Sequence, residues 1–167
     1  MSMIVGWTGH RPDLFQDPAA ARALVNATAQ DLVSHARADR FLVGGQRGVD
    51  TWVAQAAIAL GVPFTLILPL EVAAFTSDWS VDDRATLESI QTKADEVRIV
   101  GGDPEAAYTE RNRQLACGAD LLVAVWTRLQ GGGTAETIAL ARAAGTAVRE
   151  IVLPVSQTAH SPHGRGL

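Results

Sequence analysis

Short apolar runs alternate along the chain with longer segments in which alanine and other apolar residues recur at helical spacing. Each short run is almost continuously apolar, which is typical of strands that are buried on both faces of a parallel sheet. The pattern predicts six strands, at residues 3–7, 40–43, 64–68, 96–100, 121–126 and 148–153. It predicts helices at residues 17–38, 49–60, 81–93 and 104–117, and a last one that follows a Gly-rich loop and ends near residue 144.

Strands and helices that alternate along a chain form a parallel sheet, because right-handed crossovers place the helices on its two faces. We therefore expect an α/β fold with a doubly wound, mostly parallel, Rossmann-like sheet in three α/β/α layers. Residues 1–155 should form a single domain, since 167 residues are an ordinary length for one and no linker interrupts the pattern. Residues 156–167 are rich in Ser, His, Gly and Pro and read as a flexible C-terminal tail.

The least regular stretch is residues 71–80, in which Phe75 and Trp79 stand among polar residues. These two aromatic side chains could form a lid over a ligand or a contact between subunits. The second alternative favours a homodimer. The remaining tryptophans and the single cysteine are expected to be buried: Trp7, Trp52, Trp126 and Cys117.

Composition narrows the classes of partner. The net charge of −4 gives no overall attraction to nucleic acid or to an anionic membrane, although arginines can still cluster locally. One cysteine and four scattered histidines offer neither an intramolecular disulfide nor a metal cluster. The N-terminus does not read as a signal peptide, and no apolar run approaches the roughly 20 residues of a membrane helix. A cytoplasmic protein is the simplest interpretation.

Three loops that follow predicted strands carry glycine: Thr8-Gly9-His10-Arg11, Gly44-Gly45-Gln46-Arg47-Gly48-Val49-Asp50 and Gly131-Gly132-Gly133-Thr134. In a parallel sheet such loops emerge at one edge, where ligands of open α/β sheets bind. The helix after each loop begins with unpaired N–H groups and a partial positive charge, which together favour an anion. One glycine cluster is more often a tight turn, but three on one edge favour a phosphate-bearing ligand.

Individual residues in these loops allow more than one role. Arg11 and Arg47 suit bidentate phosphate contacts or a solvated surface. His10 is a turn residue or a ligand contact, and Thr134 caps the following helix, contacts the ligand, or does both. The predicted ligand-binding residues are Thr8, Gly9, His10, Arg11, Gly44, Gly45, Arg47, Gly48, Asp50, Asn112, Gly131, Gly132, Gly133 and Thr134.

Fingerprints of common nucleotide cofactors are missing from the sequence. The first strand is not followed by G-x-G-x-x-G, and no acidic residue stands where a ribose partner is expected. The P-loop with its terminal Lys-Ser/Thr and a paired Asp motif for a metal are missing as well. We therefore expect no NAD, no other cofactor and no metal.

The resemblance of the sequence to a known family lies in the blocks TGHRPDL and GGQRGVDTWVAQAA, and in Tyr108, Arg111 and Asn112 followed by ADLLVAVW and GGGT. With these blocks the sequence resembles the SLOG superfamily over about residues 3–154. This superfamily includes the lonely-guy phosphoribohydrolases, formerly called lysine decarboxylases, and DNA-processing protein A. Resemblance to the lonely-guy motif P-G-G-x-G-T-x-x-E implies Arg111 and Glu136 as catalytic residues. Here the acid follows Thr134 by two residues instead of three, which rotates it about 100° around a helix.

The leading hypothesis is a protein that binds a nucleotide or phosphorylated nucleotide derivative at these loops. The alternative is a phosphoribohydrolase-like enzyme that cleaves the N-glycosidic bond of a nucleoside monophosphate, which requires Glu136 and Arg111 to converge on the sugar. Otherwise Glu136 complements the helix dipole or binds a ribose hydroxyl. A second alternative is single-stranded nucleic-acid binding, against which the acidic charge argues. The expected partners are a small nucleotide-like ligand and, by resemblance, a second copy of the chain, with no membrane.

Overall fold

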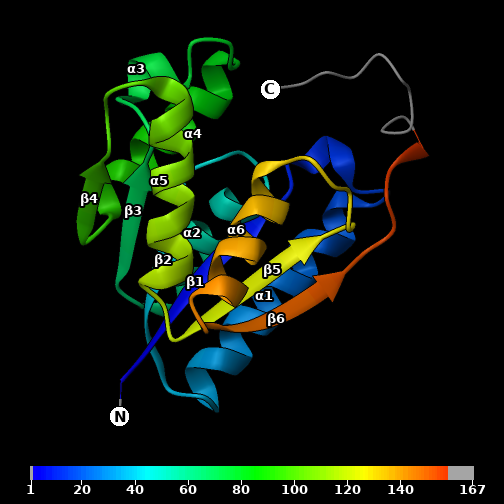
Figure 1. The fold of residues 1–167 in the computed structure, drawn as a ribbon. Coiled ribbons are helices and arrows are strands. Elements are labelled where there is room, and N and C mark those ends of the chain that lie inside the picture. Colours follow the sequence, from blue (N-terminus) through cyan, green and yellow to red (C-terminus); the bar gives the residue numbers. More distant parts are fainter. Residues whose placement is uncertain (1, 158–167) are drawn as a thin grey trace.

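Six parallel strands in one sheet form the centre of the computed structural model, which describes residues 2–157 (Figure 1). The order across the sheet is β4-β3-β2-β1-β5-β6, so the chain moves outward from β1 in one direction and then returns to build on its other side. The strands are β1 Met3–Gly9, β2 Ala38–Val43, β3 Phe64–Leu68, β4 Glu96–Ile99, β5 Leu121–Trp126 and β6 Ala147–Val152. The predicted α/β fold with a parallel sheet is confirmed.

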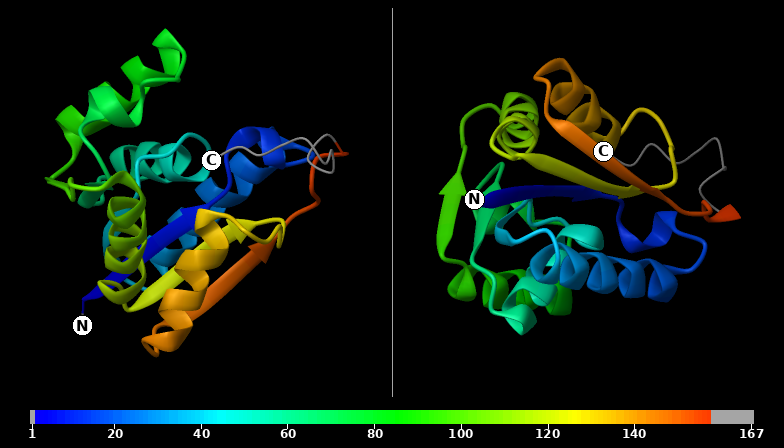
Figure 2. Two further views of the ribbon diagram at one scale, coloured as in Figure 1. Left: turned by 45° about the horizontal axis from the view of Figure 1, so that its top comes forward. Right: turned by 90° about the horizontal axis from the view of Figure 1, so that it is seen from below.

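Helices cover both faces of this sheet, which confirms the predicted three layers. Figure 2 shows α1 and α2 on one face and α5 and α6 on the other. Leu87 and Ile90 of α4 belong to the same buried cluster as the inner residues of α1 and α2. The helices are α1 Pro18–Ser34, α2 Val49–Leu60, α3 Val72–Phe75, α4 Val81–Lys93, α5 Pro104–Cys117 and α6 Gly133–Ala143, with a short 3-10 turn, η1, at Pro12–Leu14.

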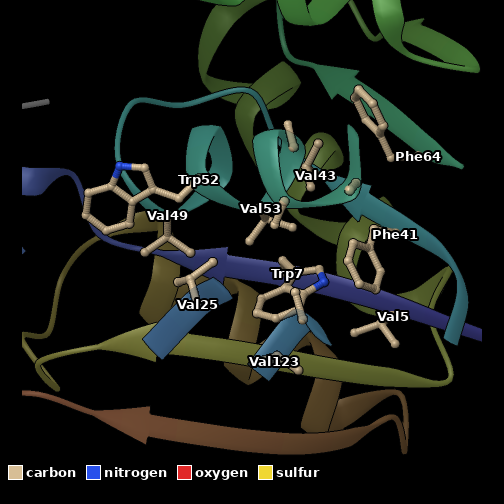
Figure 3. Close-up of a cluster of buried hydrophobic side chains, with 14 of the residues drawn as sticks. Val5, Trp7, Val25, Phe41, Val43, Val49, Trp52, Val53, Phe64 and Val123 are labelled. Carbon is tan, nitrogen blue, oxygen red and sulfur yellow. The ribbon is translucent and has the colours of Figure 1, made fainter. Parts of the chain in front are cut away.

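Successive residues of the central strands point to opposite faces, and both faces are packed. On the α1/α2 face the Trp7 ring meets the Phe41 ring edge-on at 5.4 Å between centroids (Figure 3). On the other face α5 lies directly on β1, because a Cβ atom at Gly6 would be 2.5 Å from the carbonyl oxygen of Leu115. The tryptophans expected in the core are buried there, namely Trp7, Trp52 and Trp126.

Two expectations about individual segments were wrong. The first helix was predicted to reach residue 38, but α1 ends at Ser34 and β2 already begins at Ala38. Arg37 adopts a positive φ of 56°, which turns the chain out of the helix and into the strand. Cys117 is exposed instead of buried, because it is the last residue of α5 and lies beyond that helix's inner face.

The end of the described chain is held against its beginning. Val155 forms an antiparallel bridge with Phe15, and the backbone N–H of Ser156 donates to the carbonyl of Leu14 at 2.9 Å. Most of the predicted tail, residues 158–167, lies outside the described residues. Among residues 2–157, no helix combines the length and apolar character needed to span a membrane.

Candidate functional site

The loops after β1, β2 and β5 lie together at the carboxyl edge of the sheet. The backbone N–H of His10 donates to the carbonyl of Val125 at 3.3 Å, and the N–H of Val49 donates to the carbonyl of His10 at 3.2 Å. Since β1 pairs with both β2 and β5, the strand order reverses beside β1. Ligands in open α/β sheets bind at such a reversal.

In the second loop, after β2, a backbone amide is hydrogen-bonded to a carboxylate of the same chain. Asp50, in the first turn of α2, accepts a hydrogen bond from the backbone N–H of Gln46 at 3.1 Å. Its side chain is buried, and this burial raises the pKa of Asp50 to about 6, although the neighbouring Arg111 charge acts in the opposite direction. An internal carboxylate therefore already occupies one amide of the loop that the sequence suggested for a phosphate.

The glycines of the first two loops are accounted for by packing within the chain. A Cβ atom at Gly9 would lie 2.5 Å from Cγ2 of Val49. At Gly48, where φ is 86°, it would lie 2.5 Å from the carbonyl oxygen of His10. Gly44 and Gly45 are constrained in the same way, by Nη1 of Arg111 at 2.7 Å and by Cδ2 of Leu68 at 2.5 Å. No ligand is needed to explain these four positions.

The third loop is different because it faces open space. Cβ atoms built at Gly131 or Gly132 would meet nothing within 4 Å, and one at Gly133 would meet Nδ2 of Asn112 at 3.6 Å. The residue that caps α6 is Gly132, which has no side chain to bond the first amides of the helix. Thr134 is therefore not the cap, contrary to expectation; it is a buried residue inside the first turn.

Arg111 and Asn112 connect the closed second loop to the open third one. The Arg111 guanidinium donates through Nη1 to the carbonyl of Gly44 and through Nε to Oδ1 of Asn112, the latter at 2.9 Å. Nδ2 of Asn112 in turn donates to Oε2 of Glu136 at 3.4 Å. Arg111 is 7% and Asn112 4% exposed, so both are held in place. The predicted catalytic pair, Arg111 and Glu136, thus lies on one connected chain of polar groups despite the altered motif spacing.

Residues 71–80 pack against their own chain at this edge. Cζ of Arg47 lies 4.9 Å from the centre of the Trp79 ring, and the Trp79 and Phe75 rings are 5.1 Å apart. Phe75 also lies 6.1 Å from Tyr108, whose ring is 5.7 Å from the Arg111 guanidinium. Because these aromatic residues already have partners within the chain, they supply no argument for a subunit contact, and the homodimer stays a prediction.

His10 is a buried histidine at the point where the strand order reverses. Its ring lies 5.9 Å from Phe15 and 6.2 Å from Trp126, and it is 6% exposed. Burial and the nearby Arg11 charge lower the pKa of His10 to about 4, so the ring is neutral at neutral pH. Its Nε2 atom has no hydrogen-bond partner.

Other unpaired polar atoms gather at the same edge. Six buried side-chain atoms within residues 2–157 have no partner, and four of them lie on the loops after β1, β2 and β5 or in the first turn of α2: His10 Nε2, Arg47 Nε, Asp50 Oδ1 and Thr127 Oγ1. Buried polar groups are paired in most proteins, so such a concentration favours a polar ligand. Thr127 was not among the residues predicted from the sequence; the one signal for it is that it directly follows the apolar run of β5.

Two further predicted residues are Thr8 and Arg11. Thr8 is buried within β1, opposite Ala124 of β5. Arg11 lies 3.9 Å from Asp13 and, together with Arg47, lines a cleft on the α1/α2 side. No residue of the Gly131–Thr134 loop lines that cleft, so Arg11 and Arg47 face a space separate from the third loop.

Comparison with known proteins gives the fold. No protein-family model and no curated protein matches the sequence. The structure is similar to that of DNA processing protein A from Streptococcus pneumoniae, with 17% identity and a TM-score of 0.68 over 90% of this chain and 50% of that one. It is also similar to the Moco carrier protein from Chlamydomonas reinhardtii, with 22% identity and a TM-score of 0.61 over 90% and 76% of the two chains.

A third similar structure is the molybdenum cofactor binding protein from the phototrophic bacterium Rippkaea orientalis. It shares 21% identity and a TM-score of 0.60 over 90% of this chain and 76% of that one. This chain thus spans half of the DNA processing protein and about three quarters of the other two. At these identities the likeness shows a common fold.

Proposed function

We propose that this chain, which has the fold of the SLOG superfamily, binds a nucleotide or phosphorylated nucleotide derivative at the carboxyl edge of its sheet. The phosphate would lie at the N-terminus of α6, on the loop Gly131–Gly133. The observation that carries the proposal is the open space around this loop, combined with a helix that has no side-chain cap. Helix N-termini of this kind attract anions through unpaired N–H groups and the helix dipole.

The neighbouring polar groups suit the rest of such a ligand. Glu136 carries a negative charge and would repel a phosphate, so it fits a ribose hydroxyl better. Its carboxylate is oriented by Asn112, at 3.4 Å. Nε2 of His10 and Oγ1 of Thr127 are buried and have no hydrogen-bond partner within the described residues, so a base or a sugar that reached them would satisfy them. Proteins whose solved structures are similar include two named for molybdenum cofactor, which is consistent with a small-molecule site.

Replacing Gly132 by valine tests the proposal. Gly132 has φ −113° and ψ 178°, an extended conformation that any residue adopts, and its Cβ would meet no other atom. The variant should therefore unfold like the wild type, while its side chain fills the space in front of the first α6 amides. We expect affinity for AMP, measured by calorimetry, to fall by about tenfold or more, since charge-assisted hydrogen bonds to the phosphate are each worth about 1.5–3 kcal/mol.

The matched control is Ala143→Val, at the exposed far end of the same helix, which should bind AMP like the wild type. Native mass spectrometry of protein purified from cells would show whether another phosphorylated molecule is bound instead of AMP. Equal affinity of Gly132→Val and wild type for whichever ligand is found would refute the loop assignment.

Cleavage of the N-glycosidic bond is the second candidate function, and one observation favours it. Arg111 and Glu136 are linked through hydrogen bonds to Asn112, which supports a role for both predicted catalytic groups at one site. The same AMP samples should then release adenine, and Glu136→Gln should abolish release while retaining binding. If no more adenine appeared than in AMP without protein, the enzymatic candidate would be refuted and only the binding function would remain. Single-stranded nucleic-acid binding stays a prediction that rests on the local arginines.

A further inference from the structure

The cleft that Arg11 and Arg47 line opens between the first two turns of α1, α2 and α4, on the face of the sheet opposite to α5 and α6. Its volume is about 510 Å³, and the arginines that line it are Arg11, Arg22 and Arg47. Trp52, Gln55 and Thr86 contribute to its walls. No residue of the Gly131–Thr134 loop lines this cleft, so it is separate from the site proposed above.

The three arginines come from three different segments and are poorly neutralised. Arg22, on α1, donates through Nη2 to the side-chain oxygen of Gln55 at 3.1 Å. Arg11, after β1, lies no closer than 3.9 Å to Asp13 in its ion pair. Arg47, after β2, stacks on Trp79, and its buried Nε has no hydrogen-bond partner. Within residues 2–157, neither Arg22 nor Arg47 forms a salt bridge.

Backbone charges add to this local excess of positive charge. The cleft lies beside the first turns of α2 and α4 and the second turn of α1, where helix dipoles place partial positive charge. Two carboxylates, Asp13 and Asp83, also line the cleft and oppose an anion. The arginines outnumber them, although the whole chain has a net charge of −4. The excess of positive charge in this cleft is therefore local and does not follow from the net charge of the chain.

We propose that this cleft is a second anion site, which binds a phosphorylated small molecule through Arg11, Arg22 and Arg47. Guanidinium groups present paired N–H donors that match phosphate oxygens, and three of them from separate segments can surround a group that carries several negative oxygens. The volume falls within the range of about 300–1,000 Å³ that is usual for small-molecule sites. The proposal does not depend on binding at the α6 loop.

Calorimetry with inorganic pyrophosphate tests this site, and Arg22 is the informative residue. Arg22 is exposed and bonds Gln55, so Arg22→Gln should leave the fold intact. We expect it to weaken pyrophosphate binding by about tenfold. Asp83→Asn should act in the opposite direction and tighten binding by about two- to fivefold, because it removes a like charge from the wall. The matched control is Arg113→Gln, an exposed arginine on α5, which should bind like the wild type.

The Gly132→Val variant separates the two sites. The second-site proposal predicts that this variant retains pyrophosphate binding while Arg22→Gln weakens it. If Gly132→Val lost pyrophosphate binding while Arg22→Gln bound it like the wild type, pyrophosphate would lie at α6 and the second site would be overturned. Failure of wild-type protein to bind pyrophosphate at millimolar concentration and low salt would overturn it too, without bearing on whether a nucleotide binds at α6.

Discussion

Acidic pH should lower the unfolding free energy of this protein through protonation of His10. Replacing His10 by a residue that cannot bind a proton should remove that effect. His10 is 6% exposed, and its pKa is lowered from 6.5 to about 4 by burial and by the Arg11 charge. The unfolded chain therefore takes up the proton near pH 6.5, whereas the folded protein resists it until about pH 4. The stability that the neutral ring contributes is complete above pH 6.5 and is lost as pH falls toward 4.

The size of the effect follows from the two pKa values. Since a tenfold change in proton affinity is worth about 1.4 kcal/mol, the complete loss is about 3 kcal/mol, of which about 2 kcal/mol is gone at pH 5. Asp50 acts in the opposite direction over part of this range. Burial raises the pKa of Asp50 to about 6, so its protonation stabilises the folded state as pH falls through 6. The two groups partly cancel in the wild type, and only a comparison of variants isolates His10.

Urea unfolding at pH 7.5 and pH 5.0 provides that comparison. His10→Phe retains an aromatic ring between Phe15 and Trp126 but cannot bind a proton. Between the two pH values the wild type should lose about 2 kcal/mol more unfolding free energy than this variant. His35→Gln, a substitution at an exposed histidine, should follow the wild type. Equal losses for wild type and His10→Phe would show that His10 does not stay neutral in the folded protein.

Two further predictions concern positions where the local structure decides the outcome. Gly45→Ala should lower the unfolding free energy by about 2–4 kcal/mol, because φ is 80° and the new Cβ would lie 2.5 Å from Leu68. Gly131→Ala, where φ is 85° but the space around the residue is open, should lower the unfolding free energy by only about 1 kcal/mol. If urea unfolding showed the same loss for both variants, the packing argument would be contradicted. Cys117 is exposed at the end of α5 and should react fully with a thiol reagent in native protein; protection until denaturant is added would show that it is buried.

The fold was predictable because the inner strands are mainly apolar on both faces, although β2 begins with the polar residues Asp39 and Arg40. The edge strands β4 and β6 carry exposed charged residues, yet their lengths and neighbouring turns still identified them. The end of α1 was not predictable, because it depends on Arg37, a non-glycine residue at positive φ. Local patterns favour glycine or asparagine at such a turn.

The site was less predictable because its decisive contacts join residues that are far apart in the sequence. Glycines 44, 45 and 48 suggest a phosphate-binding loop, but the pattern does not reveal that Asp50 binds the Gln46 amide or that Arg111 packs on Gly44. Likewise, Thr134 is the expected cap by composition, whereas the backbone starts α6 two residues earlier. What the pattern did indicate was that the loops after β1, β2 and β5 would reach one edge, because parallel strands require it.

The meeting of Asp50 and Arg111 has a consequence for how much of the chain can stand alone. Asp50 belongs to the helix layer on one side of the sheet and Arg111 to the layer on the other, and they meet beside Gly44 at the rim. A shortened chain that stopped before α5 would retain the carboxylate but not its cation. Loss of Arg111 would leave the buried Asp50 without its nearby positive charge and the Gly44 carbonyl without its donor. An unsatisfied buried polar group costs about 1–3 kcal/mol, a sizeable share of the total for a chain of this size. We therefore expect the first four strands to depend on the last two for their stability.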